Sequence, residues 1–238
     1  MQQIALNSDL GEGYSVYTLT DEQIIIPLID QANIACGFHG GDPTTLMKSL
    51  SLCAQHNVSV GAHPSYPDRQ GFGRRSMAMS AEELEACILY QVSALVGLAK
   101  VHGIAVSYIK PHGALYNDMM KDETIFNTVL QSVSKLPNNP DLMILATPNY
   151  KDFQEKAKKF GIKLRFEAFA DRRYTQEGAL TARSQPNAVL SEIEAIAQAK
   201  NFVNGGSPFP VDSICVHGDS PSAIAMVKSI RALIPNEE

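Results

Sequence analysis

Four of the six histidines in this chain of 238 residues closely follow a short apolar run, and this recurrence constrains the fold more than any other feature. The four places are residues 32–36 before His39, 58–62 before His63, 105–109 before His112 and 213–216 before His217. Runs of this length are too short for helices and fit buried strands. The carboxyl ends of all strands in a parallel α/β fold lie on one face, so the sequence predicts that the four histidines converge there.

Helical patterns separate the predicted strands along the whole chain. Asp42 and Pro43 are typical of an N-cap followed by a first-turn proline, and Ser80 with Glu83 has the spacing of a capping box, as Thr20 has with Gln23. Helices are predicted at residues 20–30, 44–55, 80–100, 122–134, 147–159, 184–200 and 221–233, and further strands at 4–8, 142–146 and 163–169. The long segments 64–79 and 171–183 and the shorter 110–117 are predicted loops.

The alternation of seven strands with helices decides the fold class. It favours parallel pairing with right-handed crossovers. Functional groups follow at least six of the strands, whereas an open doubly wound sheet would gather them at one switch point. We therefore expect an α/β fold in which residues 1–238 form a single domain, a seven-stranded (β/α) barrel.

Composition excludes several function classes. A net charge of −5, a pI near 5.7 and the lack of any block of basic residues argue against nucleic acid or an anionic membrane as a partner, which favours a small-molecule substrate. No amino-terminal leader pattern and no run of bilayer-spanning length is evident, so we expect a soluble, cytoplasmic protein. No phosphate-binding loop and no complete dinucleotide fingerprint is present, so a self-contained nucleotide site is not expected.

The four cysteines, Cys36, Cys53, Cys87 and Cys215, are scattered and fit neither a zinc knuckle nor a redox dithiol. We interpret them as reduced, mostly buried thiols. Cys36 and Cys215 lie in strand runs near histidines, which leaves a nucleophilic cysteine open as the less common alternative.

Charged residues at the predicted strand ends add candidates for chemistry. Asp9 and Glu12 follow the first strand, where a turn-capping role is the competing interpretation. Lys110 precedes Pro-His at a predicted barrel mouth, where a lysine needs an anionic partner. Asp171, Arg172 and Arg183 belong to a charged loop, which is either a solvated cluster or a site for carboxylates, since guanidinium groups bind carboxylates in pairs of hydrogen bonds.

Seven segments carry a resemblance to a known family: 6–13 (LNSDLGEG), 32–43 (ANIACGFHGGDP), 61–64 (GAHP), 71–75 (GFGRR), 110–117 (KPHGALYN), 169–174 (FADRRY) and 216–219 (VHGD). In order and over the whole chain, they resemble the LamB/YcsF family. Two mild departures are Gly40, where the family usually has Ala, and Glu177, where it usually has Asp.

The resemblance implies a fold and an activity. The fold would be the irregular seven-stranded (β/α) barrel of the polysaccharide-deacetylase superfamily. The activity would be that of one component in the bacterial three-component 5-oxoprolinase, which opens 5-oxoproline to L-glutamate while ATP, with magnesium, is hydrolysed to ADP and phosphate. The implied partners are subunits B and C, and whether ATP binds this chain or a partner is left open.

Within that activity, we expect acid–base roles for the groups at the strand ends. Candidate catalytic residues are Asp9, Glu12, His39, His63, His112 and His217, and candidate substrate-binding residues are Lys110, Asp171, Arg172 and Arg183. No tightly held metal is expected, because the lysine and arginines at the same mouth would repel a cation.

Two alternatives remain. One is a metal-dependent amide or N-acetyl hydrolase in which Asp9, His39, His63 and His112 supply the ligands. The other is a non-catalytic scaffold that binds partner chains. The loops at 64–79 and 171–183 are expected to dock partners or gate the barrel mouth, or else to be plain surface loops.

Overall fold

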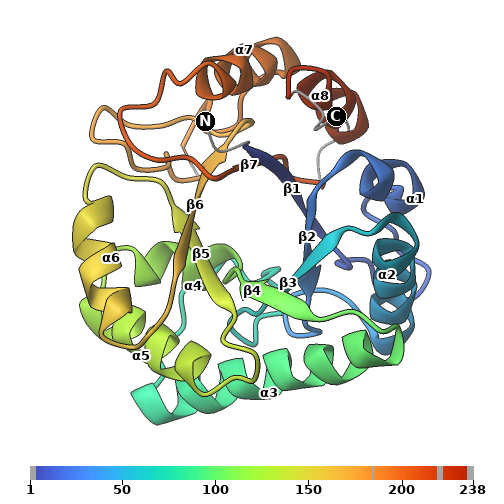
Figure 1. Ribbon diagram of the computed structural model, residues 1–238, viewed down its shortest axis with the longest axis vertical. Coiled ribbons are helices and arrows are strands. Elements are labelled where there is room, and N and C mark those ends of the chain that lie inside the picture. The colour runs from blue at the N-terminus through green and yellow to red at the C-terminus, as the bar shows by residue number, and fades with distance from the viewer. Residues whose placement is uncertain (1–3, 184, 219–221, 235–238) are drawn as a thin grey trace.

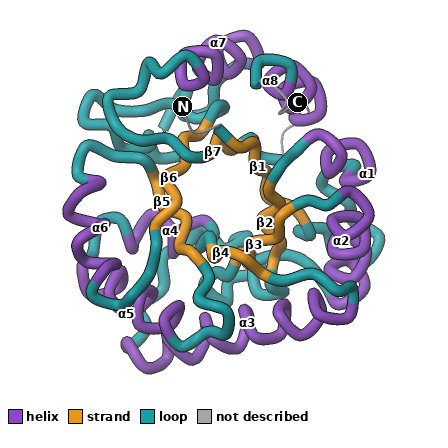
Figure 2. The backbone as a smooth tube through the Cα atoms, in the orientation of Figure 1, coloured by secondary structure: helices purple, strands orange, loops and turns teal. Residues whose placement is uncertain are grey.

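Seven parallel strands form a closed barrel with helices outside it in a computed structural model that describes residues 4–183, 185–218 and 222–234 (Figure 1). The strands are β1 (Ala5–Leu10), β2 (Gln31–Ala35), β3 (Ser59–His63), β4 (Val106–Ile109), β5 (Asp141–Leu145), β6 (Leu164–Phe169) and β7 (Ser213–Cys215). Each strand pairs with the next along the chain, and β7 returns to β1 to close the barrel (Figure 2). The predicted α/β barrel of seven strands is confirmed.

The helices fill the connections between the strands. They are α1 (Glu22–Ile25) followed by the 3-10 helix η1 (Ile26–Leu28), then α2 (Pro43–His56), α3 (Ala81–Val101), α4 (Gly113–Met119), α5 (Glu123–Ser134), α6 (Tyr150–Lys158), α7 (Glu192–Val203) and α8 (Ala223–Arg231). The predicted Asp42 cap of α2 and the Ser80–Glu83 capping box of α3 are both present.

Three predicted boundaries are wrong. The first helix is short because Pro27 lies in η1, and its N-cap is Asp21 rather than Thr20. The predicted loop at 110–117 is mostly helix α4. This helix has no side-chain N-cap from which its start could be predicted. Helix α7 begins only after a capping box at Ser191, because residues 185–190 form part of a longer loop. Ser184 and the predicted helix start at Pro221, like Asp219 of the histidine motif, lie outside the described residues.

Helix α3 contradicts the expectation that no run of the chain is long and apolar enough to span a bilayer. Its 21 residues are long and apolar enough to cross a membrane by length and composition alone, which the sequence interpretation missed. One such helix is weak evidence for a membrane span, because core helices of soluble proteins have the same character. One face of α3 packs against the rest of the fold, through the buried residues Leu84, Cys87, Ile88, Gln91, Val92, Leu95 and Ala99.

The inside of the barrel is unusually polar. Alternate residues of a strand point to opposite faces. The buried polar side chains that hydrogen-bond with one another come from β1, β2, β6 and β7: Asn7, Asp9, Asn33, Glu167 and Ser213. Gly61 of β3 leaves room for one of them, because a Cβ atom there would overlap with the ring of Tyr108 on the neighbouring β4. The barrel therefore encloses a hydrogen-bonded network that ends at the carboxyl-terminal mouth.

Candidate active site

The predicted functional groups gather at the carboxyl ends of the strands, around a cavity of about 340 Å³. Of the predicted residues, Asp9, His63, Lys110, His112, Arg172, Arg183 and His217 line this cavity. Glu12, His39 and Asp171 do not line it, but each contacts a residue that does. The structure thus brings the predicted residues together, with three of them behind the cavity wall.

Asp9 and Lys110 form a buried ion pair at the floor of the cavity. Lys110 Nζ lies 2.8 Å from Asp9 Oδ1 and 3.0 Å from Glu167 Oε2. Burial alone would raise the pKa of Asp9, but Lys110 and His63 outweigh it and hold that pKa well below its usual value. Burial alone would lower the pKa of Lys110, and the two carboxylates raise it instead. Lys110 is therefore an ammonium ion whose charge is already compensated.

Glu167 was missed by the sequence analysis although its side chain is fully buried. It lies on β6, opposite Ser213 of β7, and it shares Lys110 with Asp9. A single glutamate within an apolar strand run is the signal that could have identified it, because an unpaired buried carboxylate is costly and so implies a cation inside the barrel.

Three more polar side chains below the cavity were also missed. Tyr108 donates its hydroxyl to Asn33 Oδ1 at 2.7 Å, and Asn33 Nδ2 donates to Asn7 Oδ1 and Asp9 Oδ1, each at 2.8 Å. These bonds fix the Asp9 carboxylate from the side opposite the cavity. Asn7 lies two residues before Asp9, and Tyr108 lies two residues before Lys110. This alternate spacing would have predicted an inward-facing network.

His63 and His112 face each other through ring nitrogens 3.0 Å apart. His63 Nδ1 lies 2.6 Å from the Lys110 carbonyl and His112 Nε2 lies 2.8 Å from the Phe72 carbonyl, so both outer nitrogens must carry protons in order to donate. If both rings were neutral, the two facing nitrogens would each direct a lone pair at the other. A proton or a metal cation must therefore lie between them.

Two carboxylates can balance that positive charge. Asp9 Oδ2 lies 3.4 Å from His63 Nε2, and Glu12 Oε1 lies 3.4 Å from His112 Nδ1. Burial, together with the neighbouring His39 and His63, lowers the pKa of His112 well below its usual value. The lowered pKa disfavours the charged form of His112.

His39 supports the pair from behind. Its ring stacks on His112 with centroids 3.7 Å apart, and its Nε2 donates to Glu12 Oε1 at 3.0 Å. Burial and the neighbouring His63 lower the pKa of His39, so it is a neutral donor that orients Glu12. Gly73 packs against the rings, where a Cβ atom would come within 2.8 Å of both His39 and His112.

The loop at 64–79 therefore belongs to the site itself. Phe72 contacts the rings of His39 and His112 edge-on and accepts the hydrogen bond from His112, while Gly73 O accepts from Ala114 N at 2.8 Å. At least this part of the loop is more than a surface connection.

His217 forms the opposite wall, and Asp171 lies behind it. His217 Nδ1 lies 2.9 Å from Asp171 Oδ1, and its ring stacks on Phe169. Burial would raise the pKa of Asp171, but His217 outweighs burial and lowers it. His217 Nε2 is left facing Asp9 Oδ2, 4.0 Å away. This geometry gives a carboxylate-oriented imidazole next to the Asp9 carboxylate.

Arg172 and Arg183 lie above this floor with Arg74 and Lys121. Arg172 is buried, and its guanidinium donates to the carbonyls of Thr181 at 2.7 Å and Ala188 at 3.4 Å. Burial and the neighbouring Arg183 lower the pKa of Arg172 to about 10. Carbonyl groups hold the guanidinium in place without neutralising it.

Four buried groups could hold a metal ion: Glu12, His39, His63 and His112, whose ligand atoms all lie within 4.8 Å of one another. The parallel stacking of His39 on His112 keeps their lone pairs from converging, because the two lone pairs lie in separate parallel planes. Glu12, His63 and His112 are therefore the better set of ligands, with His39 hydrogen-bonded to Glu12.

The cysteines do not form a reactive centre. Burial raises the pKa of the Cys36 thiol to about 12 and that of Cys215 well above its usual value. Cys215 Sγ lies 3.2 Å from Lys110 Nζ and acts as a weak acceptor within the buried network. This agrees with the interpretation of both as buried thiols.

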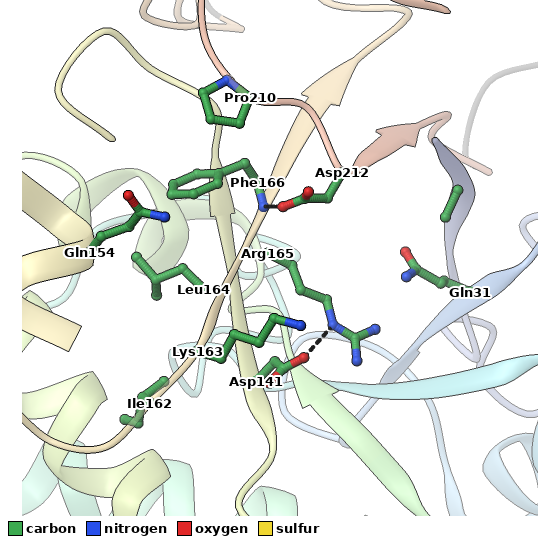
Figure 3. A pocket seen from close by; sticks show the side chains of 11 residues that line it. Gln31, Asp141, Gln154, Ile162, Lys163, Leu164, Arg165, Phe166, Pro210 and Asp212 are labelled. Carbon is green, nitrogen blue, oxygen red and sulfur yellow. Dashed lines mark hydrogen bonds and ion pairs between the residues drawn. The ribbon is translucent and has the colours of Figure 1, made fainter. Parts of the chain in front are cut away.

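A second cavity, of about 620 Å³, lies at the amino-terminal ends of the strands (Figure 3). Arg165 Nε donates to Asp141 Oδ2, and Asp212 Oδ2 accepts from the backbone N–H of Phe166, both at 2.8 Å. These two hydrogen bonds connect the amino-terminal parts of neighbouring strands. None of the predicted acid–base residues lines this cavity, so we place the chemistry at the opposite mouth despite the smaller volume there.

Comparison with known proteins agrees with both the fold and the motifs. The LamB/YcsF family model matches residues 4–238. The chain is 48% identical over 241 residues to the A subunit of 5-oxoprolinase from Vibrio cholerae serotype O1, with 97% of each chain covered. It is 42% identical to the 5-oxoprolinase A subunit numbered 3 of Pseudomonas aeruginosa, over 98% of this chain and 97% of the relative.

A solved structure is also similar. The lactam utilization protein from Thermus thermophilus superposes with a TM-score of 0.86 at 35% identity, covering 97% of this chain and 95% of that one. The barrel described above is therefore also the fold of an experimentally solved relative.

Proposed function

This chain belongs to the LamB/YcsF family, and from that premise we propose that it acts in 5-oxoproline metabolism as the A subunit of an ATP-dependent 5-oxoprolinase. The proposed reaction opens the lactam of 5-oxo-L-proline to give L-glutamate, with ATP hydrolysed to ADP and phosphate. The proposed partners are subunits B and C, and the proposed cofactor is ATP with magnesium, bound here or by a partner. The names of the relatives support this role.

One observation carries the proposal for this chain's own share of the chemistry. Asp9, His63 and His112 form a continuous buried chain of proton-holding groups that opens into a cavity, with His217 facing Asp9 across it. An arrangement of this kind can take a proton from water and return it to a leaving group.

The chemistry of the lactam requires such a device. An unstrained five-membered lactam is a poor electrophile, so ring opening needs an activated carbonyl oxygen, an activated water and a proton for the departing nitrogen. We assign Asp9 to holding the attacking water, because its ionised carboxylate is a hydrogen-bond acceptor and a weak base. We assign the proton taken from that water to His217, whose Nδ1 is held by Asp171 and whose Nε2 faces Asp9 Oδ2. We assign the proton for the ring nitrogen to the His63–His112 pair, which holds one to give.

Reconstitution tests the proposal. Purified chain, subunits B and C, 5-oxoproline, magnesium and ATP are combined, and glutamate and ADP are measured together. Equal formation of the two products, lost when this chain is left out, is the expected result. Glutamate formation without this chain would contradict the proposal. Full turnover with a Lys110→Met or His63→Gln chain would favour the scaffold alternative.

The second candidate function is a metal-dependent amide hydrolase, and the cluster of Glu12, His63 and His112 is the observation that favours it. The absence of a tightly held metal stays a prediction, but its original reason is weakened. Lys110 is compensated by Asp9 and Glu167, so its charge does not repel a cation as the sequence suggested.

Elemental analysis separates the two candidates. The oxoprolinase proposal expects no stoichiometric transition metal in the purified chain and unchanged turnover of the assembly after the chain alone is treated with a chelator and the chelator is removed. Stoichiometric zinc, lost on chelation together with activity and restored by zinc alone, would replace the shared proton by a metal and promote the hydrolase.

A further inference from the structure

The cavity at the amino-terminal ends of the strands has no part in the chemistry proposed above, although it is larger than the cavity at the other mouth (Figure 3). Its volume of about 620 Å³ lies within the range of pockets that bind small molecules. Four charged side chains line it: Asp141, Lys163, Arg165 and Asp212. The way these four charges are paired indicates what the cavity can bind.

Two of the four charges compensate each other. Arg165 Nε donates to Asp141 Oδ2 at 2.8 Å, which joins β6 to β5. The guanidinium carbon of Arg165 also lies 4.8 Å from the centre of the Tyr108 ring inside the barrel. This ion pair therefore serves the barrel itself and adds no net charge to the cavity.

Lys163 and Asp212 are the other two charges, and neither forms an ion pair within the part of the chain that the structure describes. Lys163 is exposed and directly precedes β6. Asp212 is half-buried, and its Oδ2 accepts from the backbone N–H of Phe166, a neutral donor that leaves the carboxylate charge in place. The cavity therefore presents one uncompensated positive and one uncompensated negative charge.

The two uncompensated charges are set apart within the lining. In the view of Figure 3, Arg165 lies between Lys163 and Asp212. Apolar side chains complete the walls: Ile162, Leu164, Phe166 and Pro210. Methylene groups that lie against such walls are removed from water, which favours binding. A complementary ligand thus has a short aliphatic body and an opposite charge at each end.

We infer that the amino-terminal mouth of the barrel binds a small zwitterion of the amino acid type. Its carboxylate is held by Lys163 and its ammonium group by Asp212, through charge-assisted hydrogen bonds. A dicarboxylate fits less well because its second carboxylate would meet Asp212, and a diamine fits less well because its second ammonium group would meet Lys163. The site is separate from the acid–base groups at the other mouth, so it does not rest on the proposed function.

Calorimetric titration of the isolated full-length chain tests this inference, at constant ionic strength and in a buffer that is not itself a zwitterion. Three probes share a five-carbon chain and differ only in their end groups. They are 5-aminopentanoate, with one carboxylate and one ammonium group, glutarate, with two carboxylates, and 1,5-diaminopentane, with two ammonium groups. We expect 5-aminopentanoate to bind about tenfold more tightly than either of the others.

Variants locate the binding. Lys163→Gln and Asp212→Asn are each expected to weaken the binding of 5-aminopentanoate about fivefold or more. Asn at position 212 keeps an acceptor for the Phe166 N–H group, and circular dichroism verifies that both variants are folded. Lys159→Gln is the matched control, because it removes the same charge from an exposed lysine near Lys163 that does not line the cavity. We expect this control to bind as the native chain does.

Three results would overturn the inference. One is 5-aminopentanoate binding no more tightly than the more tightly bound of the two matched probes, absence of binding included. Another is binding that stays unchanged in either cavity variant, which would place the ligand elsewhere, for example at the carboxyl-terminal mouth. The third is a loss in Lys159→Gln as large as that in Lys163→Gln, which would show that binding follows net charge. Because the readout is binding to the isolated chain, failure here leaves the proposed function untouched.

Discussion

The Asp9 carboxylate contacts or faces several of the charged and titratable groups at the barrel mouth. It touches Lys110, Asn33 and His63 at once, and it faces His217. Its two carboxylate oxygens link the buried ammonium to the histidine pair, since Oδ1 contacts Lys110 and Oδ2 contacts His63. Removing its charge therefore removes the partner of Lys110 and the carboxylate beside His63 together.

We expect Asp9→Ala and His39→Ala each to lower the turnover of the assembled enzyme by roughly 10² or more, the scale of a lost general acid or base. Asp9 acts on the water, and His39 acts through Glu12. The measurement is glutamate release by the assembly, with circular dichroism to verify folding. His56→Ala, at the exposed end of α2, is the control. Near-normal rates in folded Asp9 and His39 variants would return both residues to a structural role.

Glu167 offers a stability prediction. Its replacement by Ala removes one of two carboxylates from a buried ammonium, which is the situation that destabilises folded proteins by about 3–5 kcal/mol. We expect a loss of that order in the free energy of unfolding, measured with denaturant. Because the cause is the stranded charge of Lys110, the double variant Glu167→Ala with Lys110→Met should lose less stability than the sum of the losses of the two single variants. Strictly additive losses would refute this explanation.

At the scale of elements, the stability that the N-cap gives to helix α2 depends on pH. The Asp42 carboxylate accepts from the backbone N–H groups of Ser15, Thr44 and Thr45, and these bonds lower its pKa from 3.8 to about 2. The pKa is lowered in the folded state, so the ionised cap contributes stability that is complete above about pH 4 and is lost as the pH falls toward 2.

We therefore expect Asp42→Ala to cost about 0.5–2 kcal/mol of unfolding free energy at neutral pH, the usual value of an N-cap. Asp42→Asn keeps a capping acceptor but cannot titrate. The stability difference between the native chain and Asp42→Asn should accordingly shrink between pH 4 and pH 2, as followed by thermal unfolding across that range. A difference that stays constant over the range would show that the cap charge adds nothing.

The elements also show what the sequence could and could not predict. The seven strands were predictable because they are short runs rich in apolar residues, most of which end close to glycine, histidine or charge, while β5 ends before Thr147 and Pro148. Helix α4 was not, because its first turn, Gly113 onward, lacks a capping side chain and the Lys-Pro-His motif before it suggests a loop. The start of α7 was misplaced because residues 185–190 hold turn formers and a proline that suited an earlier helix start as well.

The sequence predicted that the site residues lie together, but it did not predict which of them pair with each other. Strand ends in one barrel must meet, so the meeting of the four histidines followed from the fold alone. The pairing of Lys110 with Glu167 depends on the register between β4, β5 and β6, which single-strand patterns do not fix. Likewise, the tautomers of His63 and His112 depend on two backbone carbonyls that no side-chain pattern reveals.

At the scale of the whole molecule, the chain gathers titratable groups at the mouth of the barrel, and its sequence shows no phosphate-binding loop of a known nucleotide site. We expect the isolated chain, given 5-oxoproline, magnesium and ATP, to release no glutamate above background. Addition of subunits B and C should restore release. Sustained glutamate formation by the chain alone, in a preparation shown by mass spectrometry to be free of partners, would contradict this expectation.

Barrel closure has a consequence for how the protein is made. The partners of Lys110 come from opposite parts of the chain, and the bond between Ser8 and Val216 spans 208 residues. A ribosome therefore exposes β1 to β4 long before it delivers Glu167 or the last strand, and the emerging ammonium cannot be enclosed until then. We expect stalled nascent chains to resist protease only after β7 has left the ribosome, in a single step; resistance of chains ending before β6 would disprove it. The first strands are therefore expected to fold stably only after the last strands have been synthesised.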